Sequence, residues 1–383
     1  MGDKVFLSFS RSSKNIVANW WWTIDKWLLS AIVFLLACGV ILSFSASPAV
    51  AEGHGWSTYR FVYRHGFYLC IASGVMLAFS LLGLKWIRRF AILGYVGAFV
   101  LVLATLFWGV EAKGAKRWID IGIQIQPSEF LKPMFVVVTA WLFEMQRRYK
   151  NFPGIIISVV LCVLTCSLLR GQPDWGMMIV VAVVWLAQFF LAGGSLKIVM
   201  FLVLIAVGAL GLGYLTVSHV QNRVDQFVSG IFNGEPSYQV KRSLEAFQNG
   251  GWFGVGVGEG VVKWHIPDAH TDFIFPVAAE EFGMIFCLMI VAAYALIVLR
   301  SMKLSGKDDN MFIVLSVCGL AVSFGLQALV NMASTLQLGP TKGMALPLIS
   351  YGGSSLLGAT IGMGMLLALT RKNIHAENRD DEG

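Results

Sequence analysis

Ten runs of apolar residues recur along the chain, and they restrict its fold more than any other feature. A helix needs about 20 such residues to cross a hydrocarbon layer of about 30 Å. Only 13% of the residues are charged, against about 25% in soluble domains. We therefore predict an all-α polytopic membrane protein with ten transmembrane helices. The expected spans are 27–47, 66–84, 90–110, 128–145, 153–170, 175–193, 196–217, 273–299, 311–332 and 350–370.

The basic residues divide the segments between the spans into two alternating classes. Most of the 29 Lys and Arg residues fall in the two chain ends and in the loops on the same side as these ends. The positive-inside rule then places both termini in the cytoplasm. We predict one membrane domain over 1–383, with cytoplasmic tails at 1–26 and 371–383 and one large extracytoplasmic loop at 218–272. A net charge of +7 could indicate a nucleic-acid partner. Because the basic residues cluster at alternate span ends, we expect none.

Three titratable side chains, Asp268, His270 and Asp272, crowd the junction between the large loop and the eighth span. Partial desolvation at the lipid boundary raises the pKa of a carboxyl above about 3.9 and improves it as a general base. We predict Asp272 as the catalytic base and His270 as a substrate-binding residue. The alternative is a structural role, in which Thr271 caps the helix and Asp272 favours its dipole. Capping, however, requires one polar group rather than three.

Two carboxylates, Glu280 and Glu281, lie further along the same apolar run. A charge at this depth costs about 2.5–3.5 kcal/mol, so it is expected to face a cavity or a partner. At 100° per residue, Glu280 lies about 80° around a helix from Asp272, and Glu281 about 180°. We predict that Glu280 shares a cavity with Asp272 and binds substrate. A buried ion pair or a hydrogen-bond anchor is the alternative.

Three cations, Lys113, Lys116 and Arg117, oppose the positive-inside trend because they lie in an extracytoplasmic segment. Arg suits bidentate phosphate contacts and Lys suits point-charge contacts, so we predict that all three bind an anionic substrate. Glu129 and Lys132 follow at the start of the fourth span, three residues apart on one helix face. They are candidates for substrate binding, or they neutralise each other.

The segment 339–356 is rich in Gly, Pro and hydroxyl residues, and Lys342 is its only charge. Non-helical backbone at membrane depth is tolerated where it lines a wet cavity. We predict substrate-binding roles for Lys342 and Ser350 there.

Three further patterns predict structure rather than chemistry. Residues 170–174 form a tight hairpin in which Arg170 and Asp174 pair, and Gln327 and Asn331 are spaced to join helices. The glycine run 250–260 imitates a nucleotide-binding fingerprint but has no βαβ context, so we reject that interpretation.

Four motifs together resemble the SEDS proteins (shape, elongation, division and sporulation) over nearly the whole chain, and the Leu-Pro-Leu-Ile-Ser-Tyr wording is closest to the division branch. The motifs are Gly114-Ala-Lys-Arg-Trp-Ile-Asp120 with Gln126-Pro-Ser-Glu129, Gln172-Pro-Asp174, Pro267-Asp-Ala-His-Thr-Asp-Phe-Ile-Phe275, and Lys342-Gly-Met-Ala-Leu-Pro-Leu-Ile-Ser-Tyr-Gly-Gly-Ser-Ser355.

This resemblance implies a peptidoglycan glycosyltransferase that polymerises lipid II on the outer face of the bacterial cytoplasmic membrane, at the division septum. It implies a polyprenyl-pyrophosphate-linked glycan as the growing substrate. The implied partners are a cognate class B penicillin-binding protein (the transpeptidase) and other divisome proteins. By motif, Asp272 matches the essential aspartate and Lys132 a family lysine.

The predicted reaction begins when Asp272 takes a proton from an acceptor hydroxyl, which attacks the anomeric carbon of the lipid-linked chain with inversion. Lys113, Lys116, Arg117 or Lys342 would stabilise the departing pyrophosphate, or a divalent cation (Mg²⁺ or Mn²⁺) would share that task. The pattern identifies no metal ligands.

Two rival functions remain. One is a lipid II flippase, with Glu129, Lys132, Arg170, Asp174 and Glu280 as an intramembrane relay. The other is a scaffold without turnover, which does not explain the cluster at Asp272.

Overall fold

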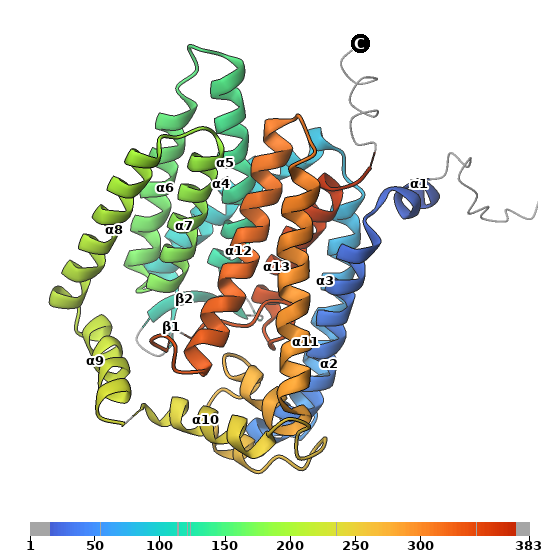
Figure 1. The fold of residues 1–383 in the computed structure, drawn as a ribbon, viewed down its shortest axis with the longest axis vertical. Helices are drawn as coiled ribbons and strands as arrows, with labels where there is room; N and C mark the ends of the chain where they lie inside the picture. Colours follow the sequence, from blue (N-terminus) through green and yellow to red (C-terminus); the bar gives the residue numbers. More distant parts are fainter. Residues whose placement is uncertain are drawn as a thin grey trace, which may run out of the picture.

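The computed structural model describes residues 16–372, except for 54, 113, 114, 121, 123, 235 and 342. Each of the ten predicted spans contains a helix, and short helices and strands connect them (Figure 1). The ten are α2 (Lys26–Gly53), α3 (Arg60–Ser80), α4 (Leu84–Trp108), α5 (Pro127–Arg148), α6 (Gly154–Gly171), α7 (Trp175–Leu191), α8 (Leu196–Thr216), α11 (Ile274–Ser305), α12 (Met311–Thr335) and α13 (Gly353–Leu369). The other elements are α1 (Ile16–Thr23), β1 (Val110–Ala112), β2 (Ala115–Asp120), β3 (Gln124–Ile125), α9 (Ser218–Phe232), α10 (Tyr238–Gly250) and the 3₁₀ helix η1 (Val262–His265).

The helices form a multi-pass membrane bundle. Within the described residues, seven helices are long and apolar enough to cross a membrane, and α7 and α13 are shorter apolar helices. The remaining one, α5, carries charges but is largely buried among its neighbours. In Figure 1, α9, α10 and the strands lie at the lower end of the bundle, which we call the loop end, whereas α1 lies near the upper end, the tail end. The predicted all-α class is confirmed.

A small antiparallel sheet is the one departure from the all-α prediction in the described part of the chain. Its order is β1-β2-β3, and Ala112 pairs with Ala115 across the first turn. The hydropathy pattern extends the third span to residue 110 and leaves 111–127 as a loop. The described strand residues of this segment instead form a wall at the loop end.

The eighth predicted span, 273–299, is made of two helices. At Gly283, α11 breaks with φ 81° and ψ 178°, a conformation that a residue with a side chain rarely adopts. Residues 284–305 alone extend for about 33 Å, which is long enough to cross the hydrocarbon layer. Residues 274–282 therefore form a separate helix at the loop end.

The glycine run 250–260 packs against this break. Met284 N donates to Gly251 O at 2.9 Å, and Val255 N donates to Glu280 O at 2.9 Å. A Cβ at Gly254 or Gly283 would overlap backbone atoms of the opposing segment. Close approach of the two backbones therefore requires glycine at 254 and 283, and these contacts tie the large loop to the helix that follows Asp272.

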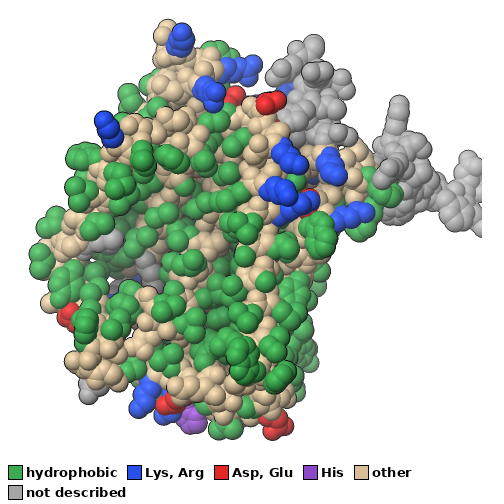
Figure 2. All heavy atoms as spheres, viewed as in Figure 1, with side chains coloured by type: hydrophobic (Ala, Val, Ile, Leu, Met, Phe, Trp, Pro, Cys, Tyr) green, Lys and Arg blue, Asp and Glu red, His purple; other side chains and the backbone are tan. Residues whose placement is uncertain are grey.

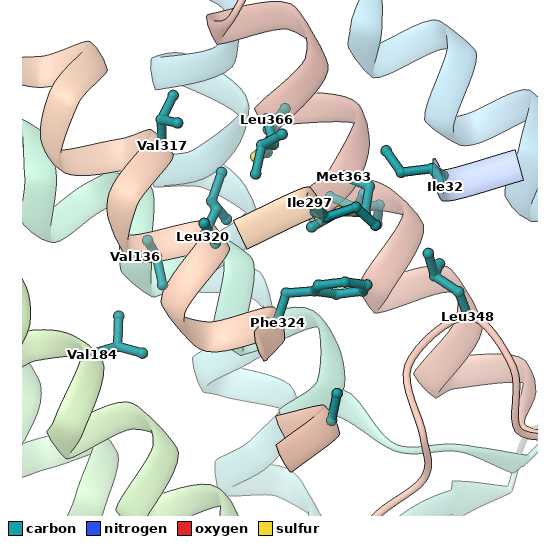
Figure 3. Close-up of a cluster of buried hydrophobic side chains, with 14 of the residues drawn as sticks. Ile32, Val136, Val184, Ile297, Val317, Leu320, Phe324, Leu348, Met363 and Leu366 are labelled. Carbon is teal, nitrogen blue, oxygen red and sulfur yellow. The ribbon is translucent and has the colours of Figure 1, made fainter. Parts of the chain in front are cut away.

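Buried aliphatic side chains from distant parts of the chain meet at the centre of the bundle. Between membrane helices the solvent offers little hydrophobic driving force, so close packing holds the helices together. Figure 3 shows the cluster formed by Ile32, Val136, Val184, Ile297, Val317, Leu320, Phe324, Leu348, Met363 and Leu366.

The segment before α13 enters this core without forming a helix. Leu346, Leu348 and Ile349 are almost completely buried, and an ideal Cβ on Gly39 would lie 2.9 Å from the carbonyl oxygens of Leu348 and Ile349. Gly39 lies near the middle of α2. Non-helical backbone therefore reaches the membrane interior, as the composition of 339–356 predicts.

We expect Gly39→Ala to destabilise the protein by about 1–3 kcal/mol, because the new methyl group would displace the backbone of 348–349 in a packed core. Thermal unfolding of the purified protein in detergent measures the effect. Gly74→Ala is the matched control, since a Cβ there meets no atom within 4 Å. Equal melting temperatures for the two variants would show that the segment does not pack tightly on α2.

Candidate active site

A cavity of about 660 Å³ opens at the loop end of the bundle. The sheet and the start of α5 form one wall, and α9 and α10 form another. The turn before α11, Thr341 and residues within 343–355 close the inner side. Its lining combines carboxylates, amides and two arginines, among them Arg117, Gln124, Gln126, Glu129, Asp174, Asn222, Arg223, Gln226, Gln239, Asp268, Asp272 and Tyr351.

Asp272 lies in a turn that precedes the helix, and its side chain faces the cavity. Asp268 adopts φ 57° at the start of this turn, and Thr271 N donates to Asp268 O at 3.0 Å. The first turn of α11 contains no acidic residue, and its N-cap position, Phe273, makes no side-chain cap bond. The capping explanation for Asp272 therefore has no support in the geometry.

Two side chains and one backbone amide from other parts of the chain hold this turn in place. Ser350 Oγ donates to Thr271 O at 2.5 Å, Tyr351 N donates to His270 O at 2.9 Å, and Asn331 Nδ2 donates to Asp272 O at 2.8 Å. Asn331 Nδ2 also lies 2.5 Å from Met344 O, so α12 joins both segments. The half-buried carboxylate of Asp272 is thereby presented from a rigid backbone.

The segment before α13, which we call the re-entrant segment, leaves room for the Asp272 carboxylate at one glycine. Gly343 has φ 60°, and a Cβ on it would lie 3.1 Å from Asp272 Oδ2. A side chain at this position would be strained and would also crowd the carboxylate. The glycine-rich composition of 339–356 thus has a direct consequence at the site.

Glu129 and Lys132 form the ion pair that their spacing predicts, and both are buried. Lys132 Nζ lies 2.7 Å from a carboxylate oxygen of Glu129 and donates to Gln327 Oε1 at 2.5 Å. Gln327 Nε2 donates in turn to Ala345 O at 3.2 Å. The pair therefore supports the floor of the cavity, which Glu129 lines.

Arg117 lines the cavity, but its guanidinium also holds the hairpin between α6 and α7. It donates to Gln172 O at 2.9 Å and to Pro173 O at 2.5 Å, and its Nη1 lies 3.8 Å from Asp174 Oδ2. The predicted pair of Arg170 and Asp174 is wrong, because Arg170 instead lies over the ring of Trp175.

The other predicted cations contribute less to the described cavity. Lys116 is exposed on β2 and is absent from the lining. Lys113 and Lys342 lie outside the described residues, so the structure does not place them. Their predicted roles stay predictions.

The shared cavity predicted for Glu280 and Asp272 is wrong. Glu280 is fully buried, and its carboxylate accepts hydrogen bonds from Asn249 Nδ2 at 3.0 Å and from the amides of Val261, Val262 and Lys263 at 2.7–2.9 Å. The neighbouring Glu281 forms a buried ion pair with Lys263. Both carboxylates therefore anchor the large loop, which is the alternative considered for them.

His270 and Ser350 lie beside the cavity without lining it. The His270 ring is buried against Phe61, at 4.6 Å between centroids, and Tyr351, at 5.3 Å. Ser350 Oγ accepts from Leu346 N at 2.8 Å as well as donating to the Asp272 turn. Their geometry is that of supports for the turn, and substrate contact by either is untested.

Arg223 is the charged residue of the described cavity lining that the sequence interpretation missed. It comes from α9, near the start of the large loop, and its Nη1 donates to Thr341 O at 3.1 Å. Asn222 and Gln226 accompany it on the same wall. The amphipathic pattern of 218–232 was the available signal, but a lone Arg in a long loop gave no reason to connect it with Asp272.

A divalent cation held by the protein would need ligands among its His, Cys, Asp and Glu side chains. Among the described residues, no three His, Cys, Asp or Glu side chains come together as a metal site. Of the cavity carboxylates, Glu129 and Asp174 already face Lys132 and Arg117. The divalent cation therefore stays a prediction, and no chemical step is assigned to one.

Comparison with known proteins identifies the family. The model of the FtsW/RodA/SpoVE family, described as cell cycle proteins, matches residues 26–375. The chain belongs to this family. It is the SEDS family that the four motifs predict, and the match covers every membrane helix described above.

Relatives of this chain carry the name FtsW, which is the division branch of the SEDS family. The chain is 41% identical over 374 residues to the probable peptidoglycan glycosyltransferase FtsW of Caulobacter vibrioides, covering 97% of this chain and 95% of the relative. It is 35% identical to the protein of the same name from Alkalilimnicola ehrlichii, covering 91% and 89%. These names confirm the division branch and the predicted enzyme class, a glycosyltransferase of cell-wall synthesis.

Solved SEDS structures share the fold. The rod shape determining protein RodA of Thermus thermophilus matches with a TM-score of 0.68 at 24% identity, covering 91% of this chain and 97% of that one. A chain from a study of a peptidoglycan synthase complex that coordinates polymerization and crosslinking matches with a TM-score of 0.72, also at 24% identity. At this identity the likeness concerns the fold alone.

Proposed function

We propose that this chain polymerises lipid II into glycan strands for the septal cell wall, with Asp272 as the general base. The observation that carries the proposal is the placement of Asp272: a half-buried carboxylate, held by a rigid turn, that faces a cavity of about 660 Å³. The family membership and the FtsW relatives support the substrate class.

In the proposed reaction, Asp272 accepts the proton of an acceptor sugar hydroxyl while the hydroxyl oxygen attacks the anomeric carbon of the lipid-linked chain. A new C–O bond forms on one face of that carbon, and the bond to the diphosphate breaks on the other. The leaving group is the polyprenyl diphosphate, and the stereochemistry inverts. A positioned base of this kind accelerates a reaction by about 10²–10⁴-fold.

We propose that the loop end faces outwards from a bacterial cytoplasmic membrane and that both termini are cytoplasmic. Figure 2 shows Lys and Arg side chains gathered toward the tail end, above a broad apolar belt, and the positive-inside rule assigns that end to the cytoplasm. Cytoplasmic nucleotides do not reach the outer face. A donor that already carries a diphosphate leaving group meets this constraint.

The proposed partners are a class B penicillin-binding protein and other divisome proteins. The fold likeness to a chain of a complex that coordinates polymerization and crosslinking supports a crosslinking partner. The relatives named FtsW support work at the septum.

The flippase alternative requires a continuous relay of charges. Glu129 is engaged with Lys132, Asp174 with Arg117, and Glu280 with the amides of the large loop. These residues form separate contacts, which favours the enzyme over the relay.

The deciding experiment supplies lipid II to the purified protein in detergent, with and without its partner and a chelator, and measures glycan polymer. We expect polymer without a sealed compartment, and comparison with the chelator decides whether a divalent cation takes part. Loss of polymer on chelation would assign a role to a divalent cation held with the substrate. Lipid II movement across sealed vesicles with no polymer under any condition would instead favour the flippase.

A further inference from the structure

The helix α9 has two faces with different surroundings. Asn222, Arg223 and Gln226 line the cavity and fall within an arc of about 100° on a helical projection. The exposed apolar side chains Ile231 and Phe232 each lie about 130° from the centre of that arc, on the opposite side of the helix. An amphipathic helix of this kind is suited to lie at the membrane boundary.

The position of α9 in the fold agrees with this assignment. It follows α8, whose apolar side chains are exposed around most of the helix, as expected for contact with lipid. In Figure 1, α8 and α9 stand at the side of the bundle, and Figure 2 shows the surface hollowed between them and α12. The cavity is therefore bounded by a helix whose other face is suited to contact lipid.

Among the described cations in or near the cavity, Arg223 differs from Lys132 and Arg117 in what it contacts. Lys132 faces Glu129, and Arg117 faces Asp174. Arg223 instead donates one N–H to the carbonyl of Thr341, and a guanidinium has five N–H donors. Burial and the nearby charge of Arg117 lower the pKa of Arg223, whereas the carboxylates of Asp174 and Asp272 act in the opposite direction. An arginine stays charged at any physiological pH, so Arg223 brings a partly buried positive charge with free N–H directions to the cavity.

We propose that Arg223 binds the diphosphate of a lipid-linked sugar, and that α9 presents it at the membrane boundary. This assignment rests on the proposed function and names the binding residue for its leaving group. A guanidinium matches two phosphate oxygens at once. The lipid-linked sugar diphosphate also matches α9. Its diphosphate meets the polar face of the helix, and its hydrocarbon chain can leave through the hollow beside α8 and α9.

The charge balance of the reaction explains why this residue would matter. When the C–O bond of the donor breaks, its electron pair goes to the diphosphate oxygen, so negative charge rises there. Asp272 and Arg223 both line the cavity. A cation already in place stabilises that charge without reorganisation.

The test measures binding separately from turnover, in the Asp272→Asn protein reconstituted in nanodiscs. The probes are undecaprenyl diphosphate and undecaprenyl monophosphate, titrated by native mass spectrometry. We expect Arg223→Ala to weaken diphosphate binding by about 10- to 100-fold, the cost of a lost hydrogen-bonded charge pair. Monophosphate binding should weaken less, and Arg223→Lys should restore part of the loss because it keeps the charge.

Arg242→Ala on α10 is the matched control, since Arg242 is bound to Glu245 at 2.6 Å and does not line the cavity. It should bind both probes as the unsubstituted protein does. Equal weakening of both probes, together with a lower melting temperature, would overturn the proposal and assign Arg223 to holding Thr341. Unchanged diphosphate binding would also overturn it.

The two proposals fail in different ways. If Arg223→Ala in the chain with Asp272 intact polymerises lipid II at the normal rate, the Arg223 assignment fails while the proposed function stands. If the unsubstituted protein binds the diphosphate through Arg223 but makes no polymer, the proposed function fails while the binding site stands.

Discussion

Asp272→Asn is expected to leave the protein folded and inserted in the membrane, but to reduce glycan polymerisation by about 10²–10⁴-fold. Asparagine has nearly the same shape, so the turn that Ser350 and Asn331 hold through backbone carbonyls keeps its contacts. It cannot accept the proton of the acceptor hydroxyl. Polymer made from lipid II by the purified protein, resolved by chain length, is the measurement.

Asp225→Asn is the control for this variant. Asp225 is an exposed acid on α9 that accepts a hydrogen bond from Tyr214, and it does not line the cavity. The control should polymerise normally, and both variants should melt at the normal temperature. Full polymerase activity in the folded Asp272→Asn protein would end the general-base proposal.

Lys263→Met is expected to destabilise the protein by about 3–5 kcal/mol, because it leaves Glu281 as an unpaired buried charge. The two side chains form an ion pair that is almost completely shielded from solvent. The loss should also reduce activity. Lys263 lies in η1, whose amides bind Glu280, and this contact ties the large loop to residues 274–282. Thermal unfolding in detergent measures the stability.

The double variant Lys263→Met/Glu281→Met separates the cost of the stranded charge from the value of the pair. Replacing both partners by apolar residues is often nearly neutral, whereas removing one is not. The double variant should therefore be more stable than Lys263→Met alone. If the double variant lost as much stability as Lys263→Met and Glu281→Met together, the two side chains would not be coupled.

The failed prediction for Glu280 has a physical cause. The projection from Asp272 to Glu280 assumes one continuous helix, but Asp272 lies in a turn that begins with a left-handed residue, and the helix starts at Ile274. The cost of a charge deep in an apolar run predicted that Glu280 and Glu281 require partners, and this was correct. The partners come from 249–263, and no helical projection along one segment could reveal them.

The partners of the arginines could not be predicted from local spacing either. Local spacing suggested that Arg170 pairs with Asp174, whereas Arg117 reaches Asp174 from β2. Arg223 contacts Thr341, which is 118 residues away in the chain. The Glu129 and Lys132 pair was predicted correctly because both residues belong to one turn of α5.

The membrane class, the ten helices, the family and the candidate base can all be predicted from the amino-acid sequence. These properties depend on local patterns, since the thickness of a bilayer sets the length of an apolar run and each motif occupies a short stretch. Only the tertiary structure decided which charges meet, where α11 breaks, and that α9 forms a wall of the cavity. Those contacts join residues far apart in the chain, and their pairing follows from how the helices and the re-entrant segment pack.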